Sequence, residues 1–150
     1  MEITIELIKE LREKTSVSVM QCKKALEEAE GDLAKAEIIL KKNSAATVLK
    51  KAERELKAGT IGFYLHGDAI GAMVLLSSET DFVSKNPEFV ALARELAMQV
   101  AAMDPENVEK LLEQPFIKDE SKIVRDLLNE ATQKFGERIE ISQFSRISVR

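Results

Sequence analysis

An α+β architecture is expected from three features of the sequence. The first part of the chain carries apolar residues at helical spacing, interrupted only by short turns. Beyond Gly59 the chain becomes rich in β-forming residues on either side of a His66–Asp68 turn. The last stretch again alternates apolar and polar residues. We therefore predict an N-terminal three-helix domain (1–42), a charged helical linker (43–58) and an α+β core (59–150) in which helices cover a small antiparallel three-stranded sheet.

Short helices account for the N-terminal domain. Thr4 precedes the first apolar run and suits an N-cap. Ser18, three residues before Gln21, has the form of a capping box that opens the second helix. Gly31 suits the left-handed end of that helix, and Asp32 suits the N-cap of the third. The apolar stripes of the three helices are Ile3, Leu7, Ile8 and Leu11; Cys22, Ala25, Leu26 and Ala29; and Leu33, Ala36, Ile39 and Leu40.

A charged, alanine-rich stretch from Lys41 to Lys57 follows these helices. Lysine and arginine are interleaved there with Glu53 and Glu55, which favours a solvated helical connector over a disordered linker.

The core begins with a predicted hairpin and a long helix. Thr60–Leu65 and Ile70–Leu76 are both rich in β-forming residues, as in an antiparallel hairpin. Asn86 followed by Pro87 fits the N-cap and first position of a helix. The amphipathic pattern that follows predicts a helix up to Asp104.

Two shorter helices and a strand are expected to complete the core. A helical pattern around Val108 and Leu111 ends at Pro115. Ser121 is expected to open a further helix, which Gly136 closes. The final stretch predicts a strand with one buried face. Its apolar face is Ile139, Ile141, Ile147 and Val149, and its polar face is Arg138, Glu140, Arg146 and Arg150.

Composition excludes several classes of protein. Hydrophobic residues make up 45% of the chain, which fits a folded protein and not a disordered one. One cysteine and one histidine exclude an internal disulfide and a Cys/His zinc site. The 22 basic and 26 acidic residues argue against a nucleic-acid-binding surface. Because no apolar run could cross a bilayer and no secretory signal is present, we expect a cytoplasmic protein without membrane contact.

Catalytic motifs are missing as well. Gly59–Gly62 lacks the third glycine of a dinucleotide-binding loop and leads into a predicted strand. Cys22 falls on the inward stripe of its helix, where a thiol is usually inert packing. His66 lies beside a turn, where a structural role is more common than a catalytic one. No spacing singles out a general acid–base pair, and no metal site is expected.

The connection between the hairpin and the long helix, Ser77–Asn86, has an unusual composition. It combines small polar residues and two acids with one large aromatic, Phe82. This side chain could pack beneath the helix, which is the commoner fate of an aromatic residue. Alternatively, it could project beside the Asp81 carboxylate as an anchor for a partner protein. Both interpretations stay open at this level.

Several motifs resemble a known family. Glu79–Val83 (ETDFV), after an apolar strand, is similar to the signature of bacterial elongation factor Ts. Leu7–Thr15 and Met20–Leu26 resemble the N-terminal motifs of that family, and Leu112–Asp119 and Phe135–Ile139 resemble its C-terminal motifs. The resemblance covers essentially the whole chain and fits a compact member with a single core module.

The resemblance implies guanine-nucleotide exchange on elongation factor Tu and not an enzymatic reaction. It implies that Phe82 inserts between helices of the partner's nucleotide domain and that Thr80 and Asp81 orient the inserted segment, which ends at Val83. This insertion would distort the magnesium–phosphate site and promote GDP release. No cofactor is expected in the chain itself, because it acts on the GDP and magnesium bound to its partner.

The N-terminal domain is implied to be ubiquitin-associated-like and to dock on the same nucleotide domain. The residues that match the family's contact region, with aliphatic tips expected to form a small exposed patch, are Leu11, Arg12, Val19 and Met20. The first interhelical turn departs from the family, because Ser16 and Ser18 replace the usual glycines. Gln21 replaces a usual aspartate.

The length of the chain implies a homodimer. Longer family members carry two related core modules, whereas only one fits between Gly59 and Arg150, and compact members tend to join two copies core to core. Some compact members have a cysteine near Ser145, and its absence removes any covalent link from the prediction. Two alternative functions remain: a non-exchanging protein-binding and oligomerisation module, and a hydrolase that uses Asp81 or His66.

Overall fold

The computed structural model describes residues 2–150, which form two compact units. One unit contains the chain up to Ala52 together with Asn129–Gly136, and the other contains Glu53–Leu128 and Glu137–Arg150. Helix α7 (Val124–Phe135) contributes to both units. The domain boundaries expected near residues 42 and 58 stay a prediction. Within the described chain, no helix is both long and apolar enough to pass through a bilayer.

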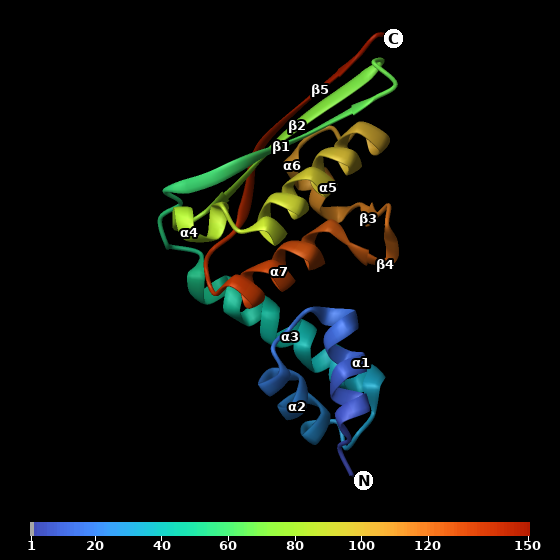
Figure 1. Ribbon diagram of the computed structural model, residues 1–150, viewed down its shortest axis with the longest axis vertical. Coiled ribbons are helices and arrows are strands. Elements are labelled where there is room, and N and C mark those ends of the chain that lie inside the picture. The colour runs from blue at the N-terminus through green and yellow to red at the C-terminus, as the bar shows by residue number, and fades with distance from the viewer. Residues whose placement is uncertain (1) are drawn as a thin grey trace. The chain divides into compact units, whose positions relative to one another are not determined.

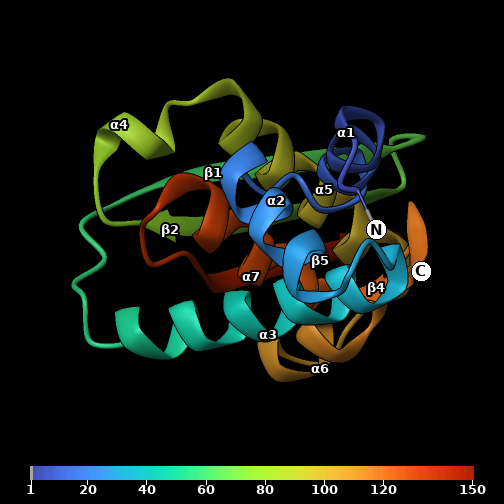
Figure 2. The same cartoon turned by 90° about the horizontal axis from the view of Figure 1, so that it is seen from below.

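The three predicted N-terminal helices are present and pack on one another (Figure 2). They are α1 (Ile5–Thr15), α2 (Val19–Glu28) and α3 (Leu33–Lys51). The side chains of Thr4, Ser18 and Asp32 each accept a hydrogen bond from the main-chain N–H three residues later, so all three predicted N-caps are confirmed. Helix α3 continues past residue 42 through part of the expected connector. The buried core between the helices is Leu11, Val17, Cys22, Ala25, Leu26, Ala29, Ala36 and Leu40.

The turn between α1 and α2 accommodates Ser16, the residue expected to replace a glycine, through local hydrogen bonds. Ser16 adopts a left-handed conformation with φ of 58°, which costs a residue with a Cβ atom more than it costs glycine. Its N–H donates to the Arg12 carbonyl at 2.8 Å. The Thr15 hydroxyl donates to the Leu11 carbonyl at 2.9 Å. These two bonds to carbonyl groups of the last turn and a half of α1 hold the turn.

The second unit contains the predicted antiparallel sheet, with strand order β1-β2-β5 (Figure 1). The strands are β1 (Ala58–His66), β2 (Ile70–Ser78) and β5 (Glu140–Ser148). Helix α5 (Pro87–Met103), with Asn86 as its N-cap, covers one face of this sheet. The predicted α+β class is therefore confirmed.

A buried glutamine organises the chain that follows α5. After α6 (Val108–Glu113), a small two-stranded sheet forms from β3 (Pro115–Phe116) and β4 (Asp119–Ile123). The fully buried Gln99 amide donates to the Pro115 carbonyl at 3.0 Å and accepts from the Ile117 N–H at 2.9 Å. Gln99 thereby fixes β3 against α5.

The prediction that Ser121 opens a helix is wrong, because Ser121 lies inside β4 and α7 begins at Val124. The Ser121 hydroxyl and N–H both donate to the Asp119 carboxylate, at 2.5 and 3.1 Å, so the hydroxyl forms a local turn and no N-cap. At the N-terminus of α7 the Asp126 carboxylate instead accepts a hydrogen bond from the Ile123 N–H, at 3.0 Å.

The predicted single apolar face of the last strand is also wrong. The pairing of β2 with β5 shifts register between Leu75 and Leu76, which pair with Gln143 and Ile141, so Ser142 is the extra residue of a bulge. A one-residue slip reverses the faces. Ile139 and Ile141 are buried, whereas Ile147 and Val149 are exposed. Beyond the bulge the polar Arg146 takes the inner face, where its Nε donates to the Ala101 carbonyl at 3.1 Å and its Nη1 lies 3.6 Å from Asp104.

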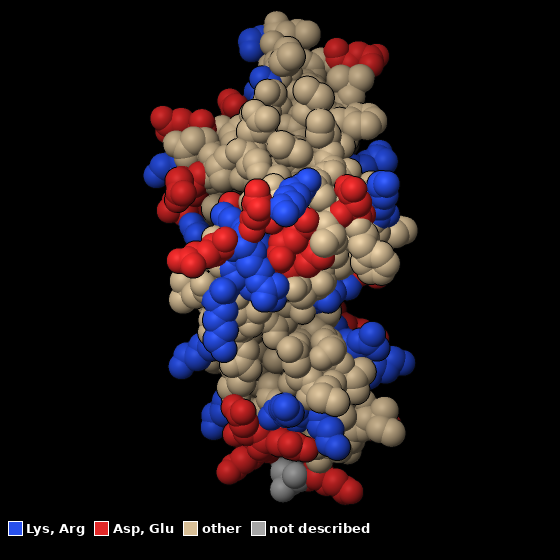
Figure 3. Space-filling view, turned by 90° about the vertical axis from the view of Figure 1, so that its left-hand side faces the viewer, with Lys and Arg blue, Asp and Glu red and all other residues tan. Residues whose placement is uncertain are grey.

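The face of the sheet opposite α5 is apolar and open. Its large exposed side chains come from all three strands and the residue after β5: Ile61, Phe63, Leu65, Met73, Ile147 and Val149. In Figure 3 the surface in the upper part of the view, where the sheet lies, carries few charged side chains. We call these six residues the open sheet face.

Candidate functional site

The segment with the unusual composition forms a one-turn helix, α4 (Asp81–Ser84), between β2 and α5. Thr80 is its N-cap and accepts a hydrogen bond from the Val83 N–H at 3.4 Å. A helix of four residues is not stable by itself, so its position depends on its caps and on the side chains that it buries. Those side chains are Val83 and Ser84.

Phe82 projects from this short helix. Its side chain is 89% exposed, whereas that of the adjacent Val83 is 5% exposed. Consecutive helical residues point about 100° apart, so burying Val83 turns Phe82 outward. Asp81 is also exposed. Of the two interpretations that the sequence allows, the structure supports the projecting aromatic residue and not the buried one.

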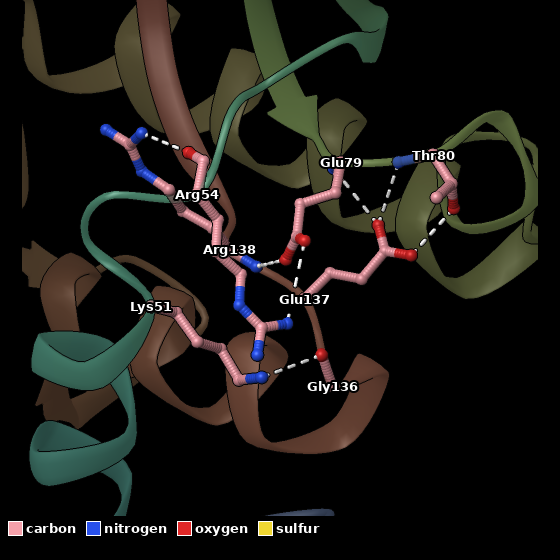
Figure 4. A network of polar contacts seen from close by, with 7 residues as sticks. All are labelled: Lys51, Arg54, Glu79, Thr80, Gly136, Glu137 and Arg138. Atoms are coloured by element: carbon pink, nitrogen blue, oxygen red, sulfur yellow. Dashed lines mark hydrogen bonds and ion pairs between the residues drawn. The ribbon is translucent and has the colours of Figure 1, made fainter.

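The carboxylate of Glu137 holds the chain that leads into α4 (Figure 4). Its Oε1 accepts hydrogen bonds from the N–H groups of Glu79 and Thr80, each at 3.0 Å. Its Oε2 accepts the hydroxyl proton of Thr80 at 2.7 Å. While the Thr80 hydroxyl donates its proton to Glu137, its oxygen can still accept a hydrogen bond from the Val83 N–H. Glu137 and the N-cap of α4 are therefore connected through one hydroxyl group.

Glu79 makes the reciprocal contact. Its Oε2 accepts a hydrogen bond from the Arg138 N–H, and its Oε1 lies 3.6 Å from Nη1 of Arg54. The Arg138 guanidinium in turn donates to the Arg54 carbonyl and pairs with Glu140 at 2.7 Å. The end of β2, the chain before β1 and the chain before β5 are therefore tied together beside α4. We call Glu79 and Glu137, with their bonds to Thr80 and Arg138, the carboxylate clamp.

Sequence reasoning does not identify this clamp. It places Arg138 only on the polar face of the last strand and gives Arg54 and Glu137 no contact, and only the resemblance of Phe135–Ile139 to a family motif includes Glu137 and Arg138. The partners lie nearly sixty residues apart in the chain, and nothing in the spacing of single acidic residues shows which of them meet.

The N-terminal candidate residues divide into exposed and buried positions. Met20 is 69% exposed and Val19 49% exposed, and Arg12 is exposed as well. The expected exposure of Leu11 is wrong, because its side chain has no exposed surface and belongs to the core of the three helices. Of the four candidates, Arg12, Val19 and Met20 are therefore exposed.

The residues considered for catalysis do not come together. His66 ends β1 and shares a hydrogen bond with the Tyr64 hydroxyl at 3.0 Å, whereas Asp81 follows the far end of β2. Nine residues of strand separate the two ends of the hairpin by about 30 Å. Cys22 is buried, with its Sγ 3.6 Å from the Val17 carbonyl. In the described part of the chain, no three His, Cys, Asp or Glu residues are grouped as a metal site requires.

Comparisons with known proteins agree with the signature around α4. The sequence model of the family described as elongation factor TS matches residues 79–150. The elongation factors Ts of Thermodesulfovibrio yellowstonii and Thermotoga neapolitana are 39% and 41% identical to the chain, with 99% of the chain and 97% and 98% of the relatives covered. Both alignments run over 193 positions, so at least 43 positions of each alignment have no residue in this chain of 150. The length and level of this identity show that the chain belongs to the elongation factor Ts family.

Proposed function

We propose that this protein is a guanine-nucleotide exchange factor that binds elongation factor Tu carrying GDP and promotes release of the GDP. Membership of the elongation factor Ts family supports this role. The single structural observation that carries the proposal is the exposed Phe82 on a helix whose opposite side is buried. Such a side chain is available to a partner without any rearrangement of the fold.

Phe82 supplies the driving force of the proposed mechanism. Transfer of an exposed phenyl ring into an apolar site of the partner is worth about 2 kcal/mol. That energy lies within the range of about 1–3 kcal/mol that typically couples two binding sites. Insertion of the ring between helices of the nucleotide domain would use this energy to distort the magnesium–phosphate site. Thr80 and Asp81 orient the ring through the N-cap and first turn of α4.

A second contact is needed so that the partner is held while its nucleotide leaves. We assign it to Arg12, Val19 and Met20, the exposed candidates of the three-helix unit. The mechanism has no covalent step, so it makes no demand for a nucleophile, a metal or a cofactor in this chain.

We further propose that two copies of the chain associate through the open sheet face. An apolar patch of this kind is uncommon on a monomer. A two-fold interface brings each patch against its own copy, so the patch must be complementary to itself. Four further residues of the central and last strands on this face, Gly71, Leu75, Gln143 and Ser145, are also uncharged. Two chains of net charge −4 can therefore meet there without bringing like charges together.

The deciding experiment measures release of a fluorescent GDP from elongation factor Tu in the presence of increasing concentrations of the protein. The release rate is expected to rise with concentration and to saturate. Because coupling is reciprocal, GDP should weaken binding of the protein by the same factor by which the protein weakens GDP, roughly 5- to 150-fold. Tight binding with an unchanged rate of GDP release would instead identify a non-exchanging binding module.

A further inference from the structure

Helix α4 cannot hold its own orientation. It has a single turn, and a helix of this length has too few internal hydrogen bonds to offset the entropy of ordering its residues. An exposed aromatic side chain on such a turn is useful to a partner only if the turn already points it correctly, because ordering it on binding would reduce the affinity. The groups that fix the turn therefore matter for binding although they do not touch the partner.

Glu137 is the main external group that fixes this turn. Its carboxylate accepts three hydrogen bonds from residues 79 and 80, at 2.7–3.0 Å. Hydrogen bonds to an ionised acceptor are stronger than neutral ones. The same Thr80 hydroxyl that donates to Glu137 accepts from the Val83 N–H. The path from Glu137 to the residue after Phe82 thus passes through a single hydroxyl group.

Glu79 makes a reciprocal contact with the main chain beside Glu137. Its carboxylate accepts from the Arg138 N–H, directly after Glu137 in the chain, and pairs with Arg54. Each glutamate thus binds the main chain beside the other, so residues 79–80 cannot move relative to residues 137–138 without breaking bonds on both sides. An additional bond from the Ser78 hydroxyl to the Thr80 carbonyl, at 3.0 Å, holds the same turn.

We propose that Glu137 is a positioning residue that keeps α4 in the orientation in which Phe82 is presented to the partner, with Glu79 as its reciprocal support. This inference rests on the proposed exchange function and deepens it. The carboxylate clamp populates the binding-competent orientation before the partner arrives. Loss of the clamp lowers that population without removing the ring.

The two residues should therefore affect different kinetic parameters. Loss of the ring in Phe82→Ala lowers the maximal rate of GDP release. Loss of the clamp in Glu137→Ala raises the half-saturating concentration of the exchange factor, because apparent affinity scales with the competent fraction, and it leaves the maximal rate within about twofold. A competent fraction of about one tenth gives roughly a tenfold increase. Glu137→Gln, which keeps an oxygen acceptor for both N–H groups, should restore most of the affinity.

The test combines these kinetics with amide hydrogen exchange in the full chain. In Glu137→Ala the amides of Glu79 and Thr80 should exchange at least about tenfold faster, while amides of α5 keep their protection. Glu140→Gln is the matched control, because it removes a carboxylate that pairs with Arg138 and not with residues 79–80. It should leave both the half-saturating concentration and the two amides unchanged.

Two results would overturn the inference. One is a half-saturating concentration for Glu137→Ala within twofold of the wild type. The other is a loss of activity in both Glu137→Ala and Glu137→Gln that is accompanied by loss of amide protection throughout the chain, because general destabilisation would then account for the lost activity. Failure of the proposed function is distinguishable, because then the wild-type protein itself does not accelerate GDP release. In that case, unchanged exchange of the Glu79 and Thr80 amides in Glu137→Ala would still refute the clamp.

Discussion

Strand β1 and helix α5 meet at backbone level, where Gly62 lies against Ala93. A Cβ atom added to Gly62 would lie 2.2 Å from the carbonyl carbon of Ala93, and its three nearest atoms all belong to the backbone of α5, which cannot move aside as a side chain can. We predict that Gly62→Ala lowers the free energy of unfolding by about 1–3 kcal/mol, the usual cost of overpacking a core, because α5 must move away from the sheet. Urea denaturation followed by circular dichroism measures this change.

Gly71→Ala is the control for that substitution. It lies in the adjacent strand, but a Cβ atom there meets only the end of the Leu65 side chain, at 3.6 Å, which is an ordinary contact. The free energy of unfolding should therefore stay within about 0.5 kcal/mol of the wild type. Equal losses in the two variants would show that strand propensity, and not the contact with Ala93, requires a glycine at position 62.

Phe82→Ala should separate function from stability. Because the ring is almost fully exposed, its removal should leave the melting temperature unchanged. Loss of about 2 kcal/mol of partner contact corresponds to roughly a 30-fold slower maximal release of fluorescent GDP from elongation factor Tu. Val83→Ala, one residue along, should do the opposite in a thermal melt, since it removes a buried side chain. A variant Phe82→Ala with wild-type release rates would refute the proposed role of the ring.

Local signals in the sequence were sufficient for most of the fold. Thr4, Ser18, Asp32 and Asn86 all cap the helices predicted for them, because capping depends on residues only two or three positions apart. The hairpin was likewise predictable, since its two strands flank a short turn. In the candidate site, the ETDFV signature located the exposed aromatic residue but not the groups that hold it.

The errors arose where long-range pairing or competing local bonds decide the outcome. Serine is a residue type that favours the N-cap position, but the Ser121 hydroxyl donates its hydrogen bond to Asp119, two residues earlier. The bulge at Ser142 depends on pairing with β2, so alternation along the last strand alone could not predict that Ile147 is exposed. The role of Glu137 could not be predicted from spacing, because its donors lie in a different part of the chain.

The open sheet face gives a test of the proposed dimer. Phe63 and Met73 are paired across β1 and β2 and are both exposed, so Phe63→Glu places a charge within this face, beside the central strand. Burying two such carboxylates in a two-fold interface is strongly unfavourable. We predict a dimer for the wild type and a monomer for Phe63→Glu in sedimentation velocity at micromolar concentration, with unchanged circular dichroism.

Leu49→Glu is the matched control for the dimer. Leu49 is also an exposed large apolar residue, but it lies on α3, outside the sheet. This variant should sediment as the wild type does. A wild-type protein that sediments as a sharp monomer would contradict the proposed association.

Cys22 provides a test of the packing of the three helices. Burial raises the pKa of its thiol above the ordinary value of 9.0 and outweighs the Thr15 hydrogen bond and the Arg12 charge, both of which lower the pKa. Above pH 9 the unfolded chain loses this proton while the folded protein keeps it, so stability falls as the pH rises. The loss is at most about 1.4 kcal/mol per pH unit.

Urea titrations between pH 8 and about pH 10 should show a steeper decline in the free energy of unfolding for the wild type than for Cys22→Ala, which lacks the titrating thiol. Equal slopes in the two proteins, or alkylation of the native thiol by iodoacetamide as fast as in guanidinium, would mean that the helices leave Cys22 accessible to water.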